Sequence, residues 1–278
     1  MKINLFQKIC VIYLLILFVF WDLLFLGGSK TGFFNFLYSF LFGLIPLIGG
    51  FIAILKSKVW GRFKSSIGKA VFFVGLGLFL WGFGETIWSY YNFFKGVAAP
   101  YPSIADIGFA PSIFFYGLGA FYISKATGAK YGLRNLYAKV FVTITPILIL
   151  LVSYYFLVII ARGGVLVPAG EGMLRTVLDI AYPVGDFLAL TISIIVSGLS
   201  FKYFGGKYKM DIFSILVGLG VMFIGDLVFS YTTNPQVNIY YNGNFGDLIL
   251  TVGLFLLTFG ILGFCSIPKL ADEKMSNK

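Results

Sequence analysis

The sequence predicts an all-α polytopic membrane protein with eight transmembrane helices, arranged as two parallel four-helix repeats. Three observations indicate this fold: the composition, the spacing of apolar segments and a motif that occurs twice. Of the 278 residues, 59% are hydrophobic and only 12% are charged, and the mean hydropathy is +0.94. A soluble domain cannot bury so much apolar surface, so the lipid bilayer is the expected solvent.

Eight segments are apolar and long enough to cross a membrane, since a spanning helix needs about 20 such residues. The first follows Lys2 and Lys8 and could imitate a signal peptide, but its apolar run is too long and lacks a small-residue cleavage site. We therefore expect it to be a retained helix. The expected helices span residues 5–27, 33–55, 69–92, 104–125, 138–161, 176–200, 211–232 and 245–267.

The basic residues predict how these helices are oriented. All but four of the 21 lysines and arginines fall in alternate loops, on one face of the membrane; the exceptions are Lys30, Lys95, Arg162 and Arg175. This is the positive-inside pattern, so both termini should be cytoplasmic in a multi-pass protein of the cell membrane. The net charge of +10 therefore indicates membrane topology rather than a nucleic-acid partner.

A repeated motif predicts an internal duplication. The segment 83–90 (FGETIWSY) matches the segment 224–231 (IGDLVFSY), so that Glu85 corresponds to Asp226. The same sequence offset carries Asp106 to Asp247, and a weaker similarity links IPLIGGF (45–51) to YPVGDF (182–187). The repeats should comprise residues 1–130 and 131–278. Because each contains four helices, the two should share one orientation, as in transporters with parallel repeats.

Three acidic residues follow a capping residue at the expected start of a helix. The matches are Ser103-Ile-Ala-Asp106, Asn244-Phe-Gly-Asp247 and Thr176-Val-Leu-Asp179. In each, the acid can accept free backbone N–H groups and lies at the positive end of the helix. Capping is the structural role expected for these acids, and ligand binding is the alternative role for Asp106 and Asp247.

Glu85, Asp186 and Asp226 are different because they lie inside expected helices, with no lysine or arginine at the same depth. A charged side chain there costs a few kcal/mol unless it is neutral, paired or exposed to water. We expect these acids to be protonated, to share hydrogen bonds with tyrosine or serine, or to hold a cation from outside. A functional site would bring all three into one outward-facing cavity. The alternative is a polar cluster that only locks helices together.

Aromatic residues crowd the same level of the membrane, and most of them suit an interfacial belt. Trp88 and Tyr90 flank Glu85 on its own helix and could help to cage a small organic cation. The candidate ligand-binding residues are Glu85, Trp88, Tyr90, Asp106, Tyr182, Asp186, Asp226 and Asp247. The chain has no histidine, and we expect no metal site, cofactor or catalytic residue.

The sequence from Pro102 to Asp106 (PSIAD) follows an aromatic-rich segment that carries Glu85 and Trp88. This arrangement resembles multi-helix membrane sensory modules of bacteria and archaea, which stand N-terminal to GGDEF diguanylate cyclase, histidine kinase or PAS domains. The resemblance covers residues 75–265 and implies a sensory function. We expect no output domain after the last apolar segment, so such a sensor would either signal through a cytoplasmic partner or have lost its output domain.

The leading hypothesis is therefore a non-enzymatic sensory or ligand-binding module, with an acidic and aromatic pocket that takes protons or a small cation from outside. The alternative is a small proton- or cation-coupled transporter that uses Glu85, Asp186 and Asp226. A membrane hydrolase is a third alternative, because paired aspartates on adjacent helices resemble intramembrane aspartyl proteases. The Gly-x-Gly-Asp motif of those enzymes does not occur at Asp186 or Asp226.

Overall fold

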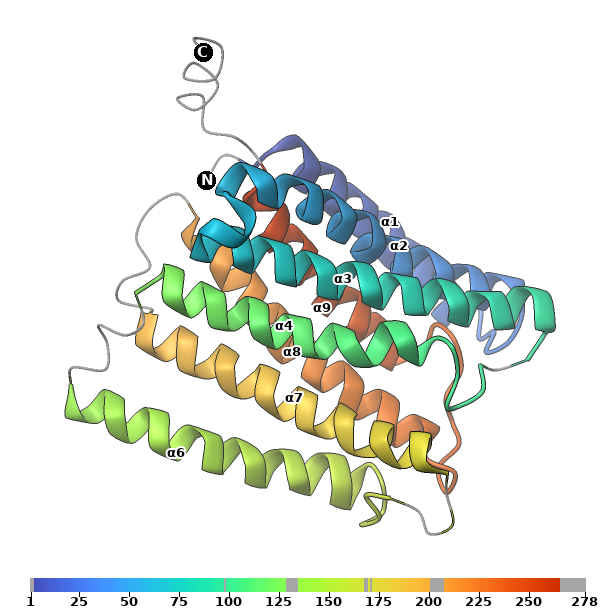
Figure 1. Cartoon of the computed structure of the whole chain (residues 1–278). Helices are drawn as coiled ribbons and strands as arrows, with labels where there is room; N and C mark the ends of the chain where they lie inside the picture. The colour runs from blue at the N-terminus through green and yellow to red at the C-terminus, as the bar shows by residue number, and fades with distance from the viewer. Residues whose placement is uncertain are drawn as a thin grey trace.

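A computed structural model describes residues 3–97, 99–128, 135–167, 170, 172–200 and 208–265, and within these ranges the fold is entirely helical (Figure 1). The long helices are α1 (Leu5–Leu26), α2 (Phe33–Lys56), α3 (Ser66–Tyr90), α4 (Asp106–Ala126), α6 (Leu136–Ser153), α7 (Met173–Ser200), α8 (Lys209–Thr233) and α9 (Phe245–Gly263). Short π-helical segments, Tyr91–Lys95 and Tyr154–Ile160, continue α3 and α6.

The all-helical fold class and the eight expected segments are confirmed: the described residues contain eight helices long and apolar enough to span a membrane. Most boundaries differ from the prediction by only a few residues. Helix α7 begins earlier than predicted, at Met173. Thr176 therefore lies inside the helix, and the predicted Thr176 cap is wrong. The expected repeat boundary at residues 130 and 131, and the expected helix end at 267, lie outside the described residues.

The helices lie side by side along a common direction, with α1 and α6 at opposite edges (Figure 1). In the first half, α2 packs against α1, α3 and α9, and α3 packs against α4. In the second half, α7 packs against α6, α8 and α4, and α8 packs against α9. Helices of the two halves therefore pack against each other in the pairs α1–α9, α2–α9, α3–α9, α4–α7 and α4–α8.

The α3–α4 and α8–α9 interfaces are close because glycines line them. Gly77 of α3 lies against Tyr116 of α4, where an added Cβ would come within 2.7 Å of the ring. Two further contacts of α3 and α4 follow this pattern, and the three pairs are Gly77–Tyr116, Gly84–Phe109 and Val74–Gly119. The equivalent pairs recur in α8 and α9, at the sequence offset that relates Glu85 to Asp226, as Gly218–Leu257, Gly225–Leu250 and Ile215–Gly260.

The two ends of the bundle differ in chemistry. At one end α1 begins beside the end of α9, where Asn4 Nδ2 donates to Leu262 O at 2.8 Å. At the other end lie the α1–α2, α3–α4, α6–α7 and α8–α9 connections, which meet through contacts such as Tyr101–Asp179 and Lys30–Tyr241. We call this second end the acid end, because Glu85, Asp106, Asp179 and Asp247 lie at or near it on the ends of their helices.

Candidate functional site

The acid end carries two separate groups of carboxylates. The Glu85 cluster consists of Glu85, Ser39, Tyr240, Asn242 and Asp247, and the Asp186 cluster consists of Asp186, Asp226, Asp106, Tyr116 and Tyr182. A ring contact between α3 and α8, Trp88 with Phe229 at 6.1 Å between centroids, lies at the same end. The structure therefore brings Asp186 and Asp226 together and places Glu85 in a different cluster.

Glu85 is held against α2. Its side chain is only 5% exposed, and its Oε1 accepts a hydrogen bond of 2.5 Å from Ser39 Oγ. Gly43 makes room for it, because a Cβ at that position would lie 2.5 Å from Glu85 Cγ. Asp247, another acid, lies close enough to interact electrostatically with Glu85. The first cluster thus buries two carboxyl groups close enough to influence each other.

Asp247 is fixed at the first turn of α9. Its backbone N–H donates to Asn244 Oδ1 at 3.1 Å, which confirms the predicted Asn244 cap. Its Oδ2 accepts from the backbone N–H of Gly243 at 2.6 Å, and its Oδ1 accepts from Tyr240 Oη at 3.3 Å. Burial and the negative charges of Asp247 and Glu85 raise the pKa of Tyr240 well above its usual range, so its hydroxyl remains a donor.

Trp88 joins this cluster through the α8–α9 connection. Its Nε1 donates to Asn242 Oδ1 at 3.1 Å, and its ring meets that of Tyr240 edge-on at 6.1 Å. Tyr240 in turn contacts the ring of Phe229 at 5.1 Å. Three aromatic rings, from α3, α8 and the α8–α9 connection, therefore contact one another, and Tyr240 joins them to Asp247. Tyr240 was not among the candidate residues predicted from the sequence.

Tyr90 lies elsewhere. It is 48% exposed and stacks on Phe94 at 5.4 Å. Five residues along a helix turn the side chain by about 140°, so Tyr90 and Glu85 occupy nearly opposite faces of α3. The structure gives Tyr90 no place in either cluster.

Asp186 and Asp226 form the centre of the second cluster. They lie on the adjacent helices α7 and α8, and their carboxyl groups are close enough to interact with each other. Tyr116 of α4 is 2% exposed and lies within electrostatic range of Asp226. Its hydroxyl has no hydrogen-bond partner in the part of the chain that the structure describes. This hydroxyl was not identified from the sequence.

Asp106 and Tyr182 connect this pair to the acid end. Asp106 Oδ2 accepts from the backbone N–H of Ser103 at 2.7 Å, as a capping residue does, whereas its Oδ1 accepts from Tyr182 Oη at 2.6 Å. Ser103 Oγ accepts from Ala105 N at 3.2 Å, so only the carboxylate half of the predicted capping box is formed at Asp106. Asp106 therefore both caps α4 and contacts α7.

A pair of arginines forms the rim above the second cluster. Arg162 Nη1 lies 3.3 Å from Asp179 Oδ1, and Arg175 Nε lies 3.8 Å from Asp179 Oδ2. Tyr101 Oη donates to Asp179 Oδ1 at 3.0 Å, and burial together with this carboxylate raises the pKa of Tyr101. Arg162 also acts electrostatically on Asp186. Asp179 is thus an ion-pair residue rather than a helix cap.

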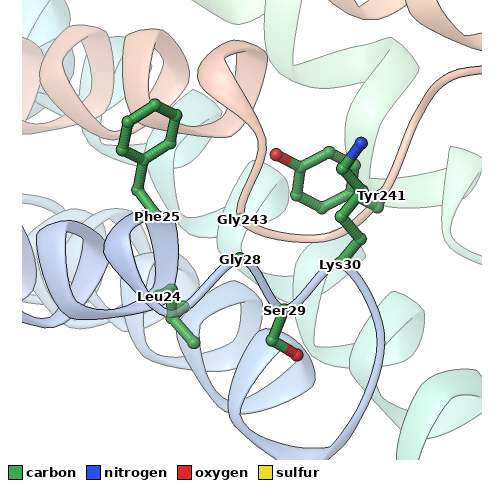
Figure 2. Close-up of a pocket in the computed structure, with 7 residues that line it drawn as sticks. All are labelled: Leu24, Phe25, Gly28, Ser29, Lys30, Tyr241 and Gly243. Atoms are coloured by element: carbon green, nitrogen blue, oxygen red, sulfur yellow. The ribbon is translucent and has the colours of Figure 1, made fainter.

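A small cavity of about 90 Å³ opens near the Glu85 cluster (Figure 2). It is lined by Leu24, Phe25, Gly28, Ser29, Lys30, Tyr241 and Gly243. The Lys30 ammonium lies 5.8 Å from the centroid of the Tyr241 ring. Gly243 belongs to the cavity wall and also contacts the Glu85 cluster, because its N–H binds Asp247.

Among the described residues, no three acids or cysteines are grouped as metal ligands. What the two clusters offer chemically is proton exchange and the binding of a positively charged group. No protein-family model matches the chain, and no similar curated protein or solved structure was found. The functional assignment therefore depends on the geometry of these clusters.

Proposed function

We propose that this chain is a non-enzymatic sensory or ligand-binding protein of the cell membrane, whose acid end faces outward and responds to protons or a small cation. The observation that carries the proposal is the pairing of Asp186 with Asp226 between two apolar helices. Two carboxyl groups that share a site hold a proton between them, and loss of that proton or its replacement by a cation changes their repulsion. Such a change would alter how α7 packs against α8.

The surroundings of the pair support an input from the acid end. Arg162, Asp179 and Tyr101 form a polar rim there, and Tyr182 with Asp106 lies between the rim and the pair. Polar and ionisable groups in a continuous series give protons a route that apolar helices alone do not. The basic residues gathered in the opposite loops support the orientation with both termini in the cytoplasm, where a signalling partner would bind.

The test is a titration of the purified protein in lipid nanodiscs, followed by tryptophan fluorescence between about pH 4 and pH 9. Trp88 contacts Phe229 of α8, so it reports movement of the helix that carries Asp226. We expect a pH-dependent change in emission that Asp186→Asn and Asp226→Asn abolish and that Asp22→Asn retains. An identical titration in the wild type and all three variants would overturn the proposal.

A transporter is the second candidate, and a specific observation favours it. The contacts of α3 with α4 match those of α8 with α9 at one constant sequence offset, and the equivalent residues Trp88 and Phe229 touch each other. This pattern supports two parallel four-helix repeats related by a twofold axis between α3 and α8, as in some transporters. Flux of protons or cations into proteoliposomes, lost on Asp186→Asn, would select transport over sensing.

A further inference from the structure

A column of buried polar groups runs along one face of α3 and its π-helical continuation, beside the first cluster. Glu85, Ser89 and Asn92 are separated by four and three residues, so their side chains lie one above another. Ser89 and Asn92 are each 2% exposed. Ser89 Oγ and Asn92 Nδ2 have no hydrogen-bond partner within the described ranges. Buried polar atoms without partners are rare in proteins, and each requires a physical explanation.

The charges around this column are unbalanced. Glu85 has Ser39 as its hydrogen-bond donor and Asp247 as its charged neighbour. Asp247 is buried to 2% exposure and receives its hydrogen bonds from Gly243 and Tyr240, which are neutral. The second cluster differs, because Arg162 supplies positive charge to Asp186. A positive charge from outside the chain would balance the first cluster.

We propose that the Glu85 cluster binds a monovalent alkali cation such as Na⁺ between α2, α3 and α9. Glu85, Ser89 and Ser39 supply carboxylate and hydroxyl oxygens, which are the ligands that hard cations prefer. Asp247 adds negative charge.

The cavity of Figure 2 borders the Glu85 cluster. Its wall includes Gly243, whose N–H is bonded to Asp247, and Ser29, whose carbonyl accepts from Asn35 Nδ2. Asn35 also donates to the carbonyl of Asn242, the residue that accepts from Trp88. Polar groups therefore connect the cavity wall to the cluster. This site lies outside the Asp186 pair and extends the proposed function, on which it rests, with a second ligand.

The experiment compares thermal unfolding of the purified protein in NaCl, KCl and choline chloride at equal ionic strength. A ligand bound only by the folded state stabilises it, so we expect the Tm to be about 5 °C higher in saturating Na⁺ than in choline. Glu85→Gln should abolish this shift, and Ser89→Ala should reduce it. Asp186→Asn should retain it, because that residue belongs to the other cluster.

Equal Tm values in all three salts, or an unchanged shift in Glu85→Gln, would overturn the proposal. If Glu85→Gln does not fold, Ser89→Ala and Ser39→Ala take its place, combined with direct binding of radioactive Na⁺ to immobilised protein. Wild-type binding that persists in both of these variants also contradicts the site. The pH titration of Asp186→Asn is independent of these results, so the two proposals can fail separately.

Discussion

The role of an individual carboxylate in this protein is decided by the residues that the fold places around it. Asp179 illustrates this, because it is 6% exposed and lies between Arg162, Arg175 and Tyr101. Removing its charge leaves the partly buried Arg162 without its anionic partner. We expect Asp179→Asn to lower the free energy of unfolding by about 2 kcal/mol.

Chemical unfolding in mixed micelles measures this effect. Asp22→Asn is the matched control, because Asp22 is exposed near the end of α1 and the same substitution there should cost less than about 0.5 kcal/mol. Equal losses in the two variants would show that the Arg162–Asp179 pair does not stabilise the fold.

Capping motifs show what can be read at single residues. Asn244 caps α9 as predicted, and Asp106 accepts the backbone N–H expected of a capping acid. Thr176 has the same spacing from Asp179 but lies inside α7. A local sequence pattern indicates which backbone groups an acid could cap, but contacts with other helices can give the acid different partners. Asp179 forms ion pairs with Arg162 and Arg175 instead, and these partners could not be predicted from the sequence spacing.

Among the helices, close approach depends on glycines at contact positions. Gly108 of α4 lies against α3, where a methyl group would overlap Leu80 O and would lie 2.6 Å from Gly84 N. Because the obstructing atoms belong to the backbone, they can give way only if the helices separate. We expect Gly108→Ala to destabilise the protein by about 2 kcal/mol, measured by thermal unfolding in detergent.

Gly220 of α8 is the control for this prediction, because a Cβ there meets no atom within 4 Å. Gly220→Ala should be neutral or stabilise the protein by up to about 1 kcal/mol, since alanine favours helix more than glycine does. If Gly108→Ala also proved neutral, the tight α3–α4 contact would not be a requirement of the fold.

All eight helices could be predicted from the sequence, because an apolar run of sufficient length has few alternatives in lipid. Their ends were less predictable. Helix α3 begins at Ser66, before the predicted start at residue 69, because the Ser65 side chain accepts a hydrogen bond from Gly68 N at 2.9 Å. Hydrophobicity locates the middle of a spanning helix, whereas caps and short polar contacts decide where it starts.

In the molecule as a whole, the predicted repeat matches Glu85 with Asp226 in the sequence, but the neighbours of these two residues in space differ. Glu85 faces Ser39 of its own half and Asp247 of the other half. Asp226 faces Asp186 of its own half. Helices that are apolar on every side give no periodic signal of which face meets which neighbour, so the division into two clusters could not be predicted from the sequence.

The interfaces between the halves predict that they can assemble as separate chains. The pairs α1–α9, α2–α9, α3–α9 and α4–α7 join the helices of residues 1–130 to those of residues 131–278. If these contacts are sufficient to hold the two halves together, fragments 1–130 and 131–278 expressed together should co-purify through a tag on one of them. Gly49→Leu should prevent this, because Gly49 of α2 lies directly against Thr258 of α9, whereas Gly220→Ala should not. Co-purification that survives Gly49→Leu would mean that the α2–α9 contact is dispensable for joining the halves.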